Sequence, residues 1–153
     1  MIEGDKIHNT LGKIASLIVV IIVTGLAIYL FGFLKNFKKD IMLNDVKIEI
    51  LSEGSGVSAR VGDEVVVNYI GTLENGFEFD NSYKRGAPFP VTIGEGRVIK
   101  GWEQGLQGIK IGEKRKLTIP PAMAYGDRAI PNLIPANSVL IFEIEAVEIH
   151  LHG

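Results

Sequence analysis

Aromatic side chains recur beside the expected loops of this sequence, and they are suited to forming an apolar binding hollow. They come from separate segments of the chain: Tyr69, Phe79, Phe89, Trp102, Tyr125 and Phe142. A shared hydrophobic core is the plainest interpretation, and composition alone favours it. However, Asp80 directly follows Phe79, and Tyr125 stands in a long loop. Because polar groups at the rim of an apolar hollow are typical of ligand sites, the pattern indicates a binding pocket.

Histidine is missing from the body of the sequence, which removes the usual base for nucleophilic catalysis. The three histidines are His8, His150 and His152, near the two ends, and there is no cysteine. Ser-His-Asp and Cys-His arrangements therefore have no base. The net charge is −2, and residues 1–40 carry five lysines against three acidic residues, so residues 41–153 carry −4. This acidic balance gives no support to nucleic-acid binding, and we expect neither a metal nor another cofactor.

One short helix is expected to position these side chains. Ile99, Trp102, Leu106 and Ile109 recur at spacings of three and four, which predicts a helix over residues 98–109 with one apolar face. Its three glycines each cost about 1 kcal/mol relative to alanine, so the helix must be held by its surroundings.

The remaining segments of the domain are predicted to form strands and turns. Alternation and β-branched residues predict strands over residues 46–51, 64–73, 77–80, 91–93, 114–119 and 138–150. Asn75-Gly76 predicts a type I′ hairpin turn. Gly86, Pro88 and Pro90 predict an irregular stretch over residues 81–90, and a long loop is expected over 122–137. The fold class is therefore α+β, with an antiparallel sheet covered on one face by a single short helix.

Several ordered motifs resemble those of the FKBP-type peptidyl-prolyl isomerases. Residues 66–76 with 79–82 are similar to the family's first signature, and residues 98–106 are similar to its second. Residues 117–121, 124–126 and 134–137 follow in the family's order, so the resemblance runs from about Val46 to Ile149. It implies a curved antiparallel sheet wrapped around the Trp102 helix, with a substrate pocket between them. It also implies proline-containing polypeptides, and macrolide immunosuppressant-type ligands, as binding partners.

The resemblance also implies roles for individual residues. Trp102 is expected to form the floor of the pocket, and Ile134 belongs to a loop that closes over the ligand. The backbone N–H of Ile99 and the hydroxyl of Tyr125 are expected to donate hydrogen bonds to substrate carbonyls. Asp80 is expected at the edge, paired with Tyr69 or Arg85. The expected catalytic residues are Asp80, Tyr125, Trp102, Phe79 and Phe142, and the expected substrate-binding residues are Tyr69, Arg85, Phe89, Val98, Ile99 and Ile134.

The implied activity is rotation of X–Pro bonds without a nucleophile, because a dry aromatic pocket binds a twisted prolyl amide better than a planar one. Two alternatives remain open at this stage. In the first, the domain is a module that binds proline-containing peptides without turnover. In the second, the chain is a membrane-tethered folding chaperone that mainly holds its clients.

An apolar run precedes the domain. Residues 14–34 contain no charged residue, and a run of about 20 apolar residues is long enough to cross a bilayer as a helix. The predicted organisation is a tail at 1–13, a transmembrane helix at 14–34, a juxtamembrane linker at 35–44 and an isomerase domain at 45–153. Lysines flank the run almost equally, but a short basic tail before an uncleaved span favours a domain outside the cytoplasm.

Overall fold

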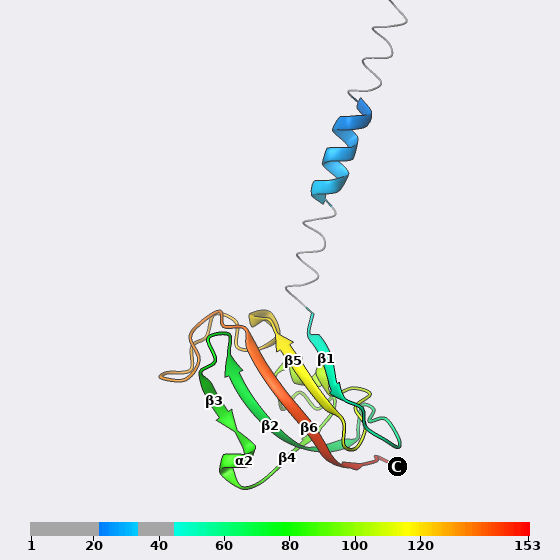
Figure 1. Ribbon diagram of the computed structural model, residues 1–153, viewed down its shortest axis with the longest axis vertical. Coiled ribbons are helices and arrows are strands. Elements are labelled where there is room, and N and C mark those ends of the chain that lie inside the picture. The colour runs from blue at the N-terminus through cyan, green and yellow to red at the C-terminus, as the bar shows by residue number, and fades with distance from the viewer. Residues whose placement is uncertain (1–21, 34–44) are drawn as a thin grey trace, which may run out of the picture. The chain divides into compact units, whose positions relative to one another are not determined.

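The computed structural model describes residues 22–33 and 45–153 of a chain that divides into two units after Ile41. Residues 22–33 form a helix (Figure 1). The side chains of this helix are exposed. Within the two described ranges, no helix has both the length and the apolar character needed to cross a membrane. The transmembrane segment expected at 14–34 includes 14–21 and 34, which lie outside the described residues, as do the expected tail at 1–13 and linker at 35–44. These three assignments therefore stay predictions.

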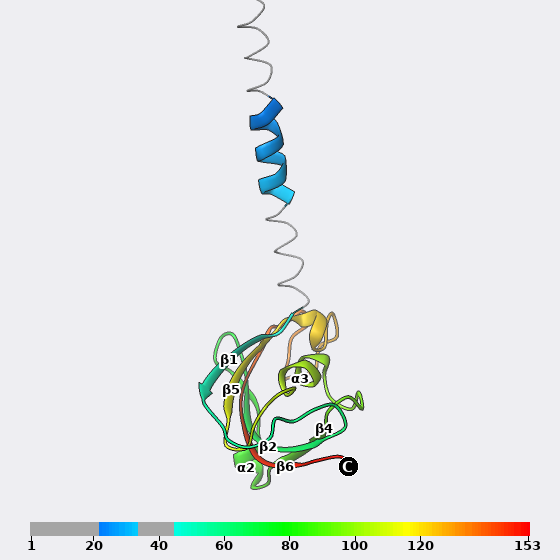
Figure 2. The ribbon, with the colours of Figure 1, turned by 90° about the vertical axis from the view of Figure 1, so that its right-hand side faces the viewer.

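Residues 45–153 fold into one antiparallel sheet with short helical segments. The strands are β1 (Lys47–Ser52), β2 (Glu64–Leu73), β3 (Glu78–Asn81), β4 (Phe89–Thr92), β5 (Lys114–Ile119) and β6 (Leu140–His150). Their order is β1-β5-β6-β2-β3, and β4 pairs with β2 as well. The sheet is curved, and helix α3 (Lys100–Gly105) lies within the curve (Figure 2). The expected α+β class and the antiparallel pairing are confirmed.

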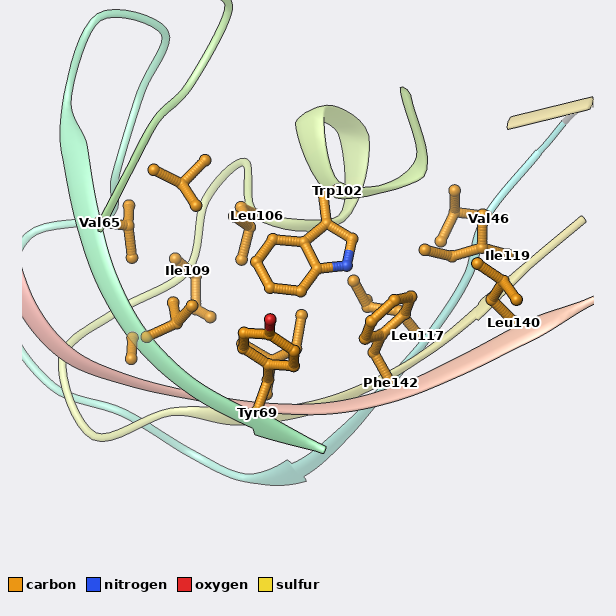
Figure 3. Packing of buried hydrophobic residues seen from close by; sticks show 14 of the residues in the cluster. Val46, Val65, Tyr69, Trp102, Leu106, Ile109, Leu117, Ile119, Leu140 and Phe142 are labelled. Atoms are coloured by element: carbon orange, nitrogen blue, oxygen red, sulfur yellow. The ribbon is translucent and has the colours of Figure 1, made fainter. Parts of the chain in front are cut away.

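The core lies between α3 and the concave face of the sheet. Burial alternates along β2 and along most of β6, as the sequence pattern predicts for strands with one buried face. Leu106 and Ile109, which follow α3, are fully buried against this face (Figure 3). The sheet therefore supplies the hydrophobic support that such a short helix requires.

The helix is shorter than its apolar periodicity predicts. It covers six residues, Lys100–Gly105, instead of 98–109, because Ile99 has an extended backbone and Gly108 a left-handed one. After α3 the chain is held by other segments, since the N–H of Gly108 donates to the carbonyl of Ala59 at 2.8 Å. Leu106 and Ile109 lie in the turn that follows α3, and both still face the core. Their spacing in the sequence therefore resembles that of a longer helix.

The predicted hairpin between β2 and β3 is present, but the prediction of a type I′ turn was wrong. Gly76 has a positive φ of 84°, whereas Asn75 does not have one. The N–H of Gly76 donates to Leu73 O at 2.9 Å, and the N–H of Leu73 donates to Phe77 O at 2.9 Å. This is a three-residue connection in which a left-handed glycine follows a tight turn.

The stretch over residues 81–90 contains more regular structure than expected. Helix α2 (Ser82–Arg85) begins at Asn81, whose side-chain oxygen accepts from the N–H groups of Tyr83 and Lys84. Pro90 lies inside β4, which is tolerated because β4 pairs on one side only, with β2. A 3₁₀ turn, η1 (Pro121–Met123), begins the long loop. The expected short helix within the curve of the sheet is α3, and the structure adds α2 and η1 as further short helical segments.

Candidate active site

Aromatic rings from α3, β2, β3 and β6 meet at one end of the curved sheet. The Trp102 indole lies 4.9 Å from the Tyr69 ring and 5.2 Å from the Phe142 ring, centroid to centroid. Phe79 lies 5.5 Å from Phe142, and all three pairs meet edge to face at 86–90°. Figure 3 shows the labelled rings of Tyr69, Trp102 and Phe142 directed toward one another. These perpendicular contacts leave ring faces and edges available to a ligand.

The rings line a cavity of about 630 Å³, within the range typical of small-ligand sites. Its lining comprises Tyr69, Phe79, Asp80, Phe89, Arg97, Val98, Ile99, Trp102, Tyr125, Ile130, Leu133, Ile134 and Phe142. The structure thus brings together every site residue expected from the sequence except Arg85. It adds Arg97, Ile130 and Leu133, whose only signal in the sequence is their position next to the recognised motifs.

Glycines let the aromatic floor sit directly on the sheet. A Cβ at Gly101 would collide with Ile119, and a Cβ at Gly105 would collide with Leu117, both on β5. The missing side chains therefore allow α3 to approach β5 closely enough to bury Trp102 to 4% exposure.

Another glycine makes room for the rings themselves. A Cβ on Gly71 would lie 2.8 Å from two ring atoms of Phe79 and 2.9 Å from Phe142 Cε1, closer than real side chains approach. Gly71 faces the cavity side of β2, so any larger residue would push both phenylalanines out of place. The position of these two rings therefore depends on a residue that has no predicted role of its own, beyond lying in the strand over residues 64–73 and in the first motif.

A hydrogen-bonded network fixes the rim next to the rings. The Tyr69 hydroxyl donates to Asp80 Oδ2 at 2.5 Å, and one Arg85 nitrogen donates to the Tyr69 hydroxyl at 2.8 Å. A second Arg85 nitrogen pairs with Asp80 Oδ1, and the guanidinium lies 5.2 Å from the Tyr69 ring centroid. Asp80 is therefore paired with both Tyr69 and Arg85, where the sequence predicted one or the other. Arg85 acts from outside the cavity lining, on the two residues that form its edge.

The network and its surroundings raise the pKa of the Tyr69 hydroxyl. Burial is the larger cause, because it disfavours the phenolate, and the hydrogen bond to Asp80 adds to it. The hydrogen bond to Tyr69 in turn raises the pKa of the Arg85 guanidinium. Tyr69 is therefore neutral and Arg85 charged throughout the physiological range.

Ser82, a residue that the sequence analysis missed, holds the Tyr69 backbone. Its hydroxyl is fully buried, accepts from the N–H of Tyr69 at 2.8 Å and donates to Asn68 Oδ1 at 3.0 Å. The only sequence signal was its position within the first motif.

Two hydrogen-bond donors that line the cavity, besides the Trp102 indole, have no partner within residues 45–153. Within residues 45–153, no hydrogen bond is formed by the backbone N–H of Ile99 or by the Tyr125 hydroxyl. Ile99 precedes the first turn of α3, where backbone N–H groups have no helical acceptor. Both residues line the cavity, so their donors are available to carbonyl groups of a ligand. The Trp102 Nε1 is a third donor without a partner in this part of the chain, and it is fully buried.

The described residues contain no group of three or more His, Cys, Asp or Glu side chains that could hold a metal ion. His150 instead contacts Glu64 at 3.0 Å and Glu148 at 3.2 Å at the end of β6, away from the cavity lining. The cavity itself offers apolar surface, unpaired hydrogen-bond donors and, among its charged side chains, the Asp80 carboxylate.

Comparison with known proteins assigns this domain to a family. Residues 56–147 match the model of the FKBP-type peptidyl-prolyl cis-trans isomerases. The FK506-binding protein 1A of Neurospora crassa is 56% identical over 108 residues, which are 70% of this chain and 90% of that protein. The peptidyl-prolyl cis-trans isomerase FPR2 of Saccharomyces cerevisiae is 46% identical over 112 residues, 70% of this chain and 83% of its own length.

A solved structure gives the same result. The crystal structure of AtFKBP13 superposes with a TM-score of 0.62 at 44% sequence identity, covering 67% of this chain and 91% of that one. The chain belongs to the FKBP-type peptidyl-prolyl cis-trans isomerases and is an enzyme that catalyses rotation about X–Pro peptide bonds.

Proposed function

We propose that this isomerase works by holding a half-rotated prolyl amide in its dry aromatic cavity, with no covalent step. A planar amide resists rotation by about 18–20 kcal/mol because its C–N bond has partial double character. Twisting localises the nitrogen lone pair and weakens the carbonyl dipole, so the twisted form loses less than the planar form when it leaves water. A cavity that excludes water therefore favours the transition state over the ground state.

The observation that carries this proposal is the combination of perpendicular aromatic rings with two unpartnered donors. Trp102, Phe79 and Phe142 supply the apolar surface. The N–H of Ile99 and the hydroxyl of Tyr125 are placed to donate to carbonyls on either side of the proline. Asp80 holds the Tyr69 ring against the Trp102 indole through the hydroxyl of Tyr69. Binding of a bent X–Pro segment needs the apolar ring surface, the two donors and the Tyr69 ring that Asp80 holds in position.

A peptide assay tests the mechanism through Asp80. We expect the chain to accelerate isomerisation of a short Leu-Pro or Phe-Pro peptide above the buffer rate. We expect Asp80→Val to lower kcat/KM by about 10- to 150-fold, because a hydrogen bond to a charged group contributes about 1.5–3 kcal/mol.

Glu74→Val is the matched control, since Glu74 is an exposed carboxylate in the turn before β3 and does not line the cavity. Circular dichroism of each variant checks that the fold is kept. Equal rates for wild type and Asp80→Val would remove the orienting role of Asp80. A wild-type rate no greater than that of buffer would remove the mechanism.

The same cavity is our proposed site for macrolide immunosuppressant-type ligands, because relatives over this domain are named FK506-binding proteins. FK506 is then expected to inhibit peptide isomerisation competitively. Inhibition without any change in KM for the peptide would place the ligand elsewhere. A domain that binds peptides without turnover, or that mainly holds clients, would show peptide binding with no acceleration.

The chain is also proposed to be anchored in a membrane through residues 14–34, with the isomerase domain outside the cytoplasm. The charge-free run supports the anchor, and part of it, residues 22–33, is helical with exposed apolar side chains such as Ile28 and Phe31. The short basic tail before the run supports the orientation.

A further inference from the structure

A second hollow lies beside the aromatic cavity. The β2–β3 hairpin and the loop over residues 129–135 enclose about 320 Å³, which we call the flanking hollow. Leu73 and Phe77 form its hairpin side, and Pro131, Leu133 and Pro135 are among the loop residues opposite. Nothing in the mechanism above uses this space.

One thin turn separates the flanking hollow from the aromatic cavity. Ile130, Leu133 and Ile134 line both spaces. The turn is closed on itself: the N–H of Ile130 donates to Ile134 O at 2.7 Å, and the N–H of Ile134 donates to Ile130 O at 2.9 Å. Asn132, with a φ of 63°, follows Pro131 at its tip, as a type II turn requires. A ligand chain that leaves the aromatic cavity over this turn therefore meets the flanking hollow next.

The surface of the flanking hollow is apolar and open to solvent. Its described lining contains no charged side chain, and Asn132 is the one residue in it with a polar side chain. Phe77 is 47% exposed and Leu133 is 45% exposed. Large apolar side chains left exposed beside an active site are typical of binding surfaces. The chemistry that fits here is an uncharged aliphatic or aromatic side chain.

Building on the proposed function, we propose that the flanking hollow is a second subsite, which receives an apolar side chain of the same client polypeptide whose X–Pro bond occupies the aromatic cavity. Continuity of the two spaces across the Ile130–Ile134 turn is the main argument, because a client chain extends beyond its proline in at least one direction. Side chains of an extended chain recur every 3.3 Å or so along it, so a neighbouring residue can reach across one turn. The enzyme then prefers X–Pro bonds that have an apolar residue nearby in the client sequence, and such residues are accessible in unfolded chains.

Two long peptides test the proposal. Both contain the same Leu-Pro pair, and they differ only in whether the flanking residues are leucine or serine; a tetrapeptide with the same pair reports the basic activity. With the full-length chain in mild detergent, we expect kcat/KM to be about tenfold higher for the leucine-flanked peptide, which is the effect of burying part of one leucine side chain. Phe77→Ser is expected to bring this ratio close to one. Val57→Ser, which removes an exposed apolar side chain far from the hollow in sequence, is expected to leave the ratio unchanged.

Each outcome decides between explanations. A wild-type ratio near one, with normal turnover of the tetrapeptide, overturns the subsite and keeps the proposed function. A tenfold ratio that survives Phe77→Ser overturns the assignment to this hollow. If the ratio is near one and Phe77→Ser converts a dimer to a monomer in sedimentation, the occupant is a second copy of the chain. Absence of tetrapeptide turnover overturns the proposed function and the subsite together.

Discussion

Tyr69 shows how one side chain serves several purposes in this site. Its ring packs edge to face on Trp102, its hydroxyl joins Asp80 and Arg85, and its backbone N–H is held by Ser82. The hydroxyl has no role as an acid or base in the proposed mechanism, because its pKa is raised above the usual 10.0, mainly by burial. Its function is to hold a ring and a carboxylate in fixed positions.

This protonation state predicts a flat pH profile. The raised pKa means that Tyr69 is fully protonated and donates to Asp80 at every pH below the ordinary tyrosine value of about 10, and that this contribution is lost only as the pH rises through the higher pKa of the folded state. We expect kcat/KM for a short Leu-Pro peptide to vary less than about twofold between pH 6 and 9, because the described residues that line the cavity include no histidine. Steady-state assays across this range provide the measurement. A bell-shaped profile would contradict a mechanism without proton transfer.

Helix α3 carries the floor of the cavity, although six residues cannot form a stable helix by themselves. Gly101 and Gly105 let it lie against β5, and buried Arg115 of β5 holds the chain where α3 ends. Arg115 donates to Gly105 O at 2.7 Å and to Gln107 O at 2.9 Å, and it forms a buried ion pair with Glu113. A charged side chain thus satisfies carbonyls that the short helix leaves without partners.

Removing this charge is expected to destabilise the domain strongly. Arg115→Met leaves the Glu113 carboxylate buried without its partner, and breaking a buried pair in this way typically costs about 3–5 kcal/mol. Urea denaturation of the variants measures the loss.

Lys114→Met is the matched control, since neighbouring Lys114 pairs with Glu145 at 3.2 Å in solvent; this change should cost less than about 1 kcal/mol. Replacing both buried partners, with Glu113→Gln and Arg115→Met together, should recover part of the stability. Equal losses for Arg115→Met and Lys114→Met would show that the buried pair does not support α3.

At the scale of the whole chain, the isomerase domain forms a unit separate from the N-terminal segment. The C-terminal end is tied to the domain, because Asp63 accepts from the N–H groups of His152 and Arg60 at 2.7 Å each. These bonds lower the pKa of the Asp63 carboxyl, with the bond from His152 as the largest cause. The FK506-binding protein 1A of Neurospora crassa and the FK506-binding protein 1 of Saccharomyces cerevisiae are matched over 90% and 98% of their own length, so they consist largely of this domain.

The proposed anchor predicts that residues 14–34 hold the protein at a membrane and that residues 42–153 are sufficient for catalysis. We expect the full chain to sediment with membranes and to resist extraction by alkaline carbonate, whereas residues 42–153 should remain in the supernatant with the same kcat/KM for a short peptide. Protease added to intact cells should digest the domain if it lies outside the cytoplasm; protection until lysis would reverse the proposed orientation. Release of the full chain by carbonate would remove the anchor.

Local patterns in the sequence determined much of this protein. Alternation along residues 64–73 and 114–119 placed β2 and β5 at their observed bounds, because side-chain period depends only on neighbouring residues. Ordered motifs identified the family, and the residues that they predicted for the site lie in the cavity lining, apart from Arg85, which contacts Asp80 and Tyr69 at the rim.

The tertiary structure decided what depends on contacts between distant segments. The end of α3 at Gly105, the steric roles of Gly71 and Gly101, and the meeting of the β2–β3 hairpin with the 129–135 loop all arise this way. A glycine in a sequence has the same local preferences wherever it occurs; only the side chain packed against it shows whether its missing Cβ makes room for a binding site.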